Sequence, residues 1–191
     1  MSEAWLNAAL KLAKGTVQAS AELSKLSPGI ARTTALSASP SKVVSALEQF
    51  HECVRYLNTR RSKGAVIDIK NEEDVQDVIF LMLRPWIADL IPENPTDRVA
   101  SRFVIEDFLS KELNTVVEAK FIRDKKHGRT ITKELHDDIE TYRNHPNCSE
   151  LIFFIYDPNW LIPDSVALRR QIQVERDYGG KRLSVYCVIK P

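Results

Sequence analysis

The sequence is poor in the residues that form disulfides and structural metal sites. Its three cysteines, Cys53, Cys148 and Cys187, lie far apart and form no Cys-X-X-Cys pair, which argues against a disulfide framework and against a structural zinc site. We expect them to be reduced residues of the core. The four histidines show no spacing typical of a metal site, and we expect His136 and His145 at the surface.

Long hydrophobic runs and an excess of one charge are also missing. No apolar run reaches the roughly 18 residues of a transmembrane helix, and the start of the chain lacks the features of a secretory signal. We therefore expect a cytoplasmic protein without a membrane partner. With 27 basic and 26 acidic residues the formal net charge is +1, so binding to nucleic acid would have to come from local basic patches.

The composition is that of an ordinary globular chain, with 43% hydrophobic and 28% charged residues among 191. Apolar spacing predicts a helix over residues 2–26 and a second one over about 40–60. The second helix carries a narrow heptad-like seam formed by Val43, Leu47, Phe50, Val54 and Leu57. This seam either packs on the protein's own body or forms a surface for dimerisation or partner docking. We divide the chain into a helical extension, residues 1–62, and a domain, residues 63–191.

The domain alternates helical and extended segments. Asn71 is placed to cap a helix that begins at Glu72, and its acidic first turn suits the helix dipole. The segments that follow are a strand at 87–91, a hairpin at 103–123, a helix at 131–144, a strand at 151–156, a helix at 164–177 and a strand at 183–189. This mixture predicts an α/β layered fold. We expect Trp86 and Trp160 to be packing residues.

The hairpin at residues 103–123 consists of two apolar, β-branched runs around a short polar break. A symmetric turn would place Asp107 directly across from Glu118, and strand alternation would put Lys120 on the same side as Glu118. Two carboxylates and a lysine would then share one patch. Such a patch suits metal-dependent phosphodiester hydrolysis, because Mg²⁺ is usually held by one or two carboxylates. The same pattern is also typical of an ordinary half-exposed strand.

Several separated motifs resemble one known family. They are Asn71-Glu72-Glu73-Asp74-Val75-Gln76-Asp77, Asp107-Phe108, Val117-Glu118-Ala119-Lys120, Glu134-Leu135 with Asp138-Ile139 and Tyr142, and Phe154-Ile155-Tyr156-Asp157-Pro158. In this order they resemble the PD-(D/E)XK nuclease superfamily, and residues from about 57 to 191 resemble the restriction-endonuclease domain named after DpnII and MboI. The resemblance implies a mixed central sheet flanked by helices.

The resemblance also implies roles for individual residues. Asp107, Glu118, Glu72 and the Ala119 carbonyl would bind Mg²⁺, with Mn²⁺ as a substitute, and Lys120 would position the attacking water. The residues expected to contact DNA are Gln76, Arg102, Arg123, Lys125, Lys126 and Arg129, although the basic residues from 123 to 129 also fit a solvated loop.

The sequence departs from the family pattern near Arg102, which lies farther from Asp107 than the family has it. This leaves open whether Glu106 or Glu134 joins the metal site. We expect Asp138 to be a structural residue paired with an arginine, and Asp157 to end a strand.

Two functional hypotheses follow. The first is a Mg²⁺-dependent DNA endonuclease, which the resemblance suggests is a prokaryotic antiphage defence effector controlled by a partner subunit. Residues 1–62 would then mediate homo-oligomerisation or bind that partner. The second is a catalytically silent nuclease-fold module that acts as a scaffold through protein contacts, which the displacement near Arg102 and the near-neutral net charge favour.

Overall fold

The computed structural model describes residues 38–59, 67–95 and 105–191. The chain divides into two units, residues 1–37 and residues 38–191. The predicted helix at 2–26 and Arg102 lie outside the described residues. The second unit thus includes residues 38–62, and the division into a helical extension at 1–62 and a domain at 63–191 stays a prediction.

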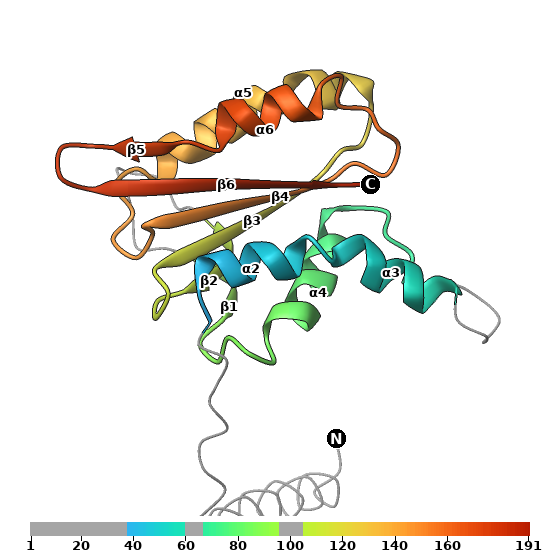
Figure 1. The fold of residues 1–191 in the computed structure, drawn as a ribbon, viewed down its shortest axis with the longest axis horizontal. Helices are drawn as coiled ribbons and strands as arrows, with labels where there is room; N and C mark the ends of the chain where they lie inside the picture. The colour runs from blue at the N-terminus through green and yellow to red at the C-terminus, as the bar shows by residue number, and fades with distance from the viewer. Residues whose placement is uncertain (1–37, 60–66, 96–104) are drawn as a thin grey trace, which may run out of the picture. The chain divides into compact units, whose positions relative to one another are not determined.

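The second unit is built around one six-stranded mixed sheet (Figure 1). Its elements are α2 (Pro40–Leu47), α3 (Phe50–Thr59), α4 (Glu72–Leu83), β1 (Ile91–Pro95), β2 (Ile105–Ser110), β3 (Thr115–Phe121), α5 (Lys125–Tyr142), β4 (Glu150–Tyr156), α6 (Ser165–Ile172), β5 (Glu175–Asp177) and β6 (Arg182–Lys190). The strand order is β1-β2-β3-β4-β6-β5, in which β3, β4 and β6 are parallel and the other pairs antiparallel. The predicted α/β class is confirmed.

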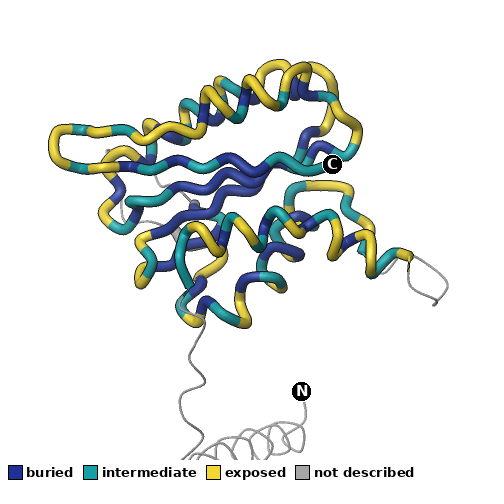
Figure 2. The backbone as a smooth tube through the Cα atoms, in the orientation of Figure 1, coloured by how far each residue is buried: buried dark blue, intermediate teal, exposed yellow. Residues whose placement is uncertain are grey.

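Helices cover both faces of this sheet, with α5 and α6 on one face and α2 and α4 on the other (Figure 1). The central strands are the most buried part of the chain, as Figure 2 shows. Two apolar clusters result, one under α5 and α6 and one under α2 and α4. No helix in the described ranges is long and apolar enough to cross a membrane.

The predicted helix over residues 40–60 is two helices, because a turn at residues 48–49 separates α2 from α3. Val43, Leu47 and Phe50 of the heptad-like seam are fully buried. The Phe50 ring lies 4.5 Å from the ring of Phe154 on β4, measured between centroids. This part of the seam therefore packs on the sheet, which is why the second unit begins before it.

Two local predictions differ from the structure. Residues 87–90 are not a strand; Ile87 and Leu90 are buried beneath α4, and β1 follows them. That strand contains two prolines, which an edge strand tolerates because its outer side needs no ladder hydrogen bonds. The predicted helix at 164–177 ends at Ile172, and its last residues form β5.

Some single residues also lie elsewhere than expected. Cys148 and Cys187 are buried, as predicted, but Cys53 is exposed. Asp157 ends β4 as predicted, and both of its carboxylate oxygens accept backbone hydrogen bonds, from Leu161 N and Ile162 N. Trp160 was predicted to pack, yet it is 73% exposed. Exposed positions near the end of a sheet are where binding residues often lie.

Candidate active site

The hairpin of β2 and β3 has the register expected from its sequence. The paired residues are Phe108 with Val117, Leu109 with Val116, and Ser110 with Thr115. Because the pairs nearest the turn are symmetric about residues 111–114, the apolar side chains of Phe108 and Val117 enter the cluster under α4. Glu118 and Lys120 then face the opposite layer, toward α5.

Asp107 was expected to pair directly with Glu118 across the hairpin, but the structure has no such pair. The ladder ends at Phe108, and Asp107 Oδ2 instead accepts a hydrogen bond of 2.7 Å from Ala119 N. Gln76 on α4 also hydrogen-bonds to Asp107. The ring of Phe108 stacks on Phe80 of the same helix, so two consecutive β2 residues both reach α4 and strict alternation is lost at this point.

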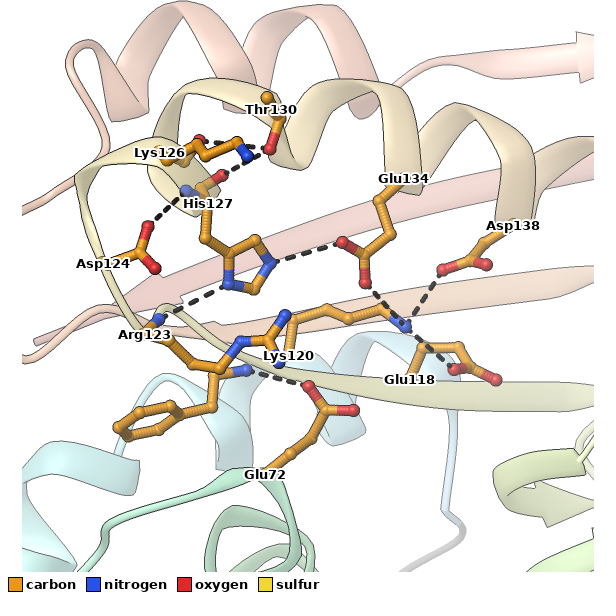
Figure 3. Close-up of polar contacts among 11 residues, drawn as sticks. Glu72, Glu118, Lys120, Arg123, Asp124, Lys126, His127, Thr130, Glu134 and Asp138 are labelled. Carbon is orange, nitrogen blue, oxygen red and sulfur yellow. Dashed lines mark hydrogen bonds and ion pairs between the residues drawn. The ribbon is translucent and has the colours of Figure 1, made fainter.

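Lys120 lies among carboxylates from two elements (Figure 3). Its Nζ is 3.7 Å from Glu118 Oε2 on β3. On α5 it is 3.1 Å from Asp138 Oδ2 and 3.8 Å from Glu134 Oε1. The predicted partner of Asp138 was an arginine, and this was wrong: at i and i+4 on α5, Glu134 and Asp138 face the same strand and share its lysine.

Tyr142 also contacts this group. It lies four residues after Asp138 on α5. Its hydroxyl donates a hydrogen bond to Glu118 Oε1. The side chains of Glu134, Asp138 and Tyr142 thus form a stripe along one side of the helix. The sequence motif assigned Tyr142 no role, although the four-residue steps from Glu134 to Asp138 and from Asp138 to Tyr142 are a signal that all three face the same side.

Helix α5 begins earlier than predicted, at Lys125, so the basic segment from 124 to 129 is not a loop. The Asp124 side chain caps the helix by accepting a hydrogen bond of 2.8 Å from His127 N. Gly128 allows the first turn of α5 to pack closely on the loop after β4, since an added Cβ would lie 2.4 Å from the Leu161 carbonyl oxygen. The cap and this close packing outweigh the poor helix propensity of glycine.

The early start of α5 brings His127 to the site. Its Nε2 is 3.3 Å from Glu134 Oε2, and its Nδ1 is 3.4 Å from Arg123 N. The Arg123 N–H can only donate, so Nδ1 accepts and Nε2 carries the proton directed at Glu134. Glu134 therefore bridges His127 and Lys120 (Figure 3).

Glu72 reaches the same region from the opposite layer. At the start of α4, its Oε2 accepts a hydrogen bond of 3.1 Å from Phe121 N. A hollow of about 270 Å³ opens beside it, lined by Lys70, Asn71, Glu72, Glu73, Phe121, Arg123, His127 and Glu134. The hollow lies where β3 ends, so a ligand there would be close to Glu72 and to the His127–Glu134 pair.

Glu106 contacts the segment that follows α5. It is fully buried, and its Oε1 is 2.6 Å from Nε2 of His145. His145 is only 4% exposed, so the expectation of a surface residue was wrong. Its ring packs edge-on against Tyr142. The two residues form a buried acid–imidazole pair that fixes β2 beside α5.

The carboxylates of the site are held at high electrostatic cost. Burial, with Asp107 nearby, raises the pKa of Glu118 to about 8. Burial is also the main cause that raises the pKa of Glu72, Asp107 and Asp138. Each group resists ionisation because a low-dielectric surrounding and like charges disfavour the anion. The site would therefore gain from added positive charge.

Two carboxylates of the site are the residues that would hold a divalent cation. Asp107 and Glu118 are the two carboxylates next to the Ala119 backbone, and Mg²⁺ is usually bound by one or two carboxylates together with water. Within the described residues, no three acidic, histidine or cysteine side chains form a ready-made metal site. Such a centre would thus be completed by water, substrate and the Ala119 carbonyl.

The basic residues expected to contact nucleic acid are on the outside of the same edge. Arg123 follows β3, and Lys125, Lys126 and Arg129 lie in the first turns of α5; all four are exposed. Gln76, in contrast, is half-buried and engaged with Asp107. Arg123 lines the hollow, and the other three follow it closely in the chain, which suits contact with a phosphate backbone.

Comparison with known families gives one match. The model of the DpnII-MboI family, described as REase_DpnII-MboI, matches residues 41–190. None of the curated proteins and none of the solved structures matches the chain. The matched segment includes every strand of the sheet and each described residue of the site.

Proposed function

Because the chain belongs to the DpnII/MboI family of restriction endonucleases, we propose that it is a metal-dependent DNA endonuclease whose active site is centred on Asp107, Glu118 and Lys120. The observation that carries the proposal is the position of Lys120. Its ammonium group lies within 4 Å of three carboxylates, on β3 and α5. Perturbed titratable groups gathered in this way are typical of functional sites.

Asp107, Glu118 and Glu72, with the Ala119 carbonyl, would hold Mg²⁺ or Mn²⁺. A divalent cation there would activate water and offset the charge of the phosphate. Gln76 would keep Asp107 in place through its hydrogen bond. Tyr142 would do the same for Glu118, because its hydroxyl holds one oxygen and leaves the other directed toward Lys120.

Lys120 would act as a charged donor rather than as a base. Burial tends to lower its pKa, but Asp138, Glu118 and Glu72 together raise it above the ordinary value. A side chain that stays protonated at neutral pH cannot accept a proton from water. It can orient the water and stabilise negative charge that develops on the phosphate.

The exposed cations at the edge of the site would hold the DNA backbone. They are Arg123, Lys125, Lys126 and Arg129, and Arg102 is proposed to join them. We further propose an antiphage defence role under the control of a partner subunit, with oligomerisation or partner binding through residues 1–62. The family supports the endonuclease activity on which this role depends.

The proposal is tested by cleavage of a supercoiled plasmid in Mg²⁺ or Mn²⁺. Lys120→Ala and Asp107→Asn should each lower the cleavage rate by at least about 100-fold. Lys111→Ala, a change of an exposed lysine in the hairpin turn, is the matched control and should cleave as the unmodified chain does. Equal cleavage by all four proteins would refute this site, and no cleavage by any would favour the scaffold hypothesis.

A further inference from the structure

A second hollow lies at the same edge of the sheet as the proposed active site. It has a volume of about 320 Å³, and the residues that matter most in its lining are Trp160, Ile162, Val166, Arg169, Arg170 and Lys190. Its walls are apolar and its rim is basic. Hollows of this size, with few polar groups, are typical of ligand sites.

Trp160 is held at this hollow in an unusual way. It has a positive φ of 54°, which a bulky side chain rarely adopts. The loop around Trp160 is fixed because the buried Asp157 carboxylate accepts hydrogen bonds from Leu161 N, at 2.8 Å, and from Ile162 N, at 2.9 Å. A strained backbone thus presents a large aromatic ring, 73% exposed, to solvent. Such strain is concentrated at functional positions.

The charge around the ring is positive. Arg170 is exposed and makes no ion pair within the described residues, whereas Arg169 and Lys190 share the single carboxylate of Glu48. Asp157 contributes little to the surface, since both of its oxygens accept backbone hydrogen bonds. An exposed aromatic ring beside an arginine that makes no ion pair, here Arg170, is an arrangement on which nucleic-acid bases stack.

The second hollow lies at the same ends of the central strands as the proposed active site. Phe121 on β3 lines the first hollow and pairs with Tyr156 on β4. Tyr156 in turn pairs with Lys190 on β6, and the three strands are parallel. Lys190 lines the second hollow, near the chain end marked in Figure 1. Two strand spacings are roughly 10 Å, or about three base-pair steps of DNA. The first turn of α5 fills the space between them, because Gly128 packs on Leu161.

We propose that the hollow beside Trp160 binds an unpaired base of the DNA substrate, stacked on the indole, with a neighbouring phosphate held by Arg170 and Arg169. The inference rests on the proposed function, since it extends the DNA path beyond the cleavage site. It adds a contact that favours single-stranded or locally opened DNA, because a base within a duplex is already stacked.

The first test is DNA affinity, measured by fluorescence anisotropy with labelled single-stranded oligonucleotides in EDTA. Loss of a base–aromatic stack weakens binding by about 5- to 150-fold, and this is the effect expected of Trp160→Ala. Trp160→Phe keeps a ring and should retain most of the affinity. Tyr56→Ala removes another exposed ring, 70% exposed on α3, and should leave the affinity unchanged.

The second test changes the DNA and keeps the protein intact. Each base of the oligonucleotide is replaced in turn by an abasic site. At least one position should weaken binding to the unmodified chain but not to Trp160→Ala. If the unmodified chain cleaves DNA and Trp160→Ala binds as tightly as it does, or if no abasic position matters, the base site is refuted while the proposed function stands. Without any DNA binding or cleavage by the unmodified chain, both fail.

Discussion

Glu118→Gln should change how the stability of the metal-free protein depends on pH. Burial and the nearby Asp107 raise the pKa of this carboxyl from 4.5 to about 8. A group that binds its proton more tightly in the folded protein than in the unfolded chain stabilises the fold while it is protonated. Its contribution is therefore complete below about pH 4.5 and is lost as the pH rises to about 8.

The size of the effect follows from the same two pKa values. Between pH 5.5 and 8.5 the unfolded chain has released this proton, whereas the folded protein releases most of it within the window. At about 1.36 kcal/mol per pH unit, the free energy of unfolding should fall by about 3 kcal/mol over this range. Glutamine cannot ionise, so the variant should lose that part of the slope.

The assay is urea denaturation in EDTA at several pH values between 5.5 and 8.5, with the free energy of unfolding obtained by linear extrapolation. The difference between the variant and the unmodified chain should grow with pH in favour of the variant. Glu112→Gln, an exposed glutamate in the hairpin turn, serves as the control and should give a constant difference. A constant difference for Glu118→Gln as well would refute the claim that the folded protein raises the pKa of Glu118.

Two other perturbations test the metal centre and the start of α5. Mn²⁺ at about 100 times its Kd should raise the free energy of unfolding by about 2.7 kcal/mol; a thermal-shift increase that persists in Asp107→Asn would contradict the proposed ligand set. Gly128→Ala should destabilise the protein by about 1–3 kcal/mol in urea, because the new Cβ meets the Leu161 carbonyl at 2.4 Å. At Gly179 an added Cβ would meet no atom within 4 Å, but the φ is 68°, so Gly179→Ala should cost about 1 kcal/mol from backbone strain alone. A Gly128→Ala effect no larger than this would refute the close-packing argument.

The hairpin could be predicted because its information is local. Two alternating apolar runs and a short polar break determine which residues pair, and a slip of one residue would expose the whole buried face. The pairs from Phe108 to Ser110 match that register. The position of Asp107 could not be derived in this way, since it depends on Ala119 N and on Gln76 of a different helix.

Helix α5 shows why the rest of the site was missed. Its first turn contains two lysines, which the helix dipole disfavours at a helix start, and a glycine, which has a poor helix propensity. The deciding contacts come from Asp124 and from the backbone of Leu161. Only when the helix starts at Lys125 does His127 lie two turns before Glu134 on the same side of α5, so an error in one helix boundary removed a residue from the predicted site.

The same cluster also explains why a stable fold would not keep these residues without a use for them. Glu72, Asp107, Glu118 and Asp138 all have a raised pKa, and one lysine is their shared cation. Replacing such a group with neutral residues would in general stabilise the protein. A divalent cation, which carries a high charge in a small volume, would offset the raised pKa values of these carboxylates. The slope lost in Glu118→Gln would measure part of the electrostatic cost of the cluster without metal.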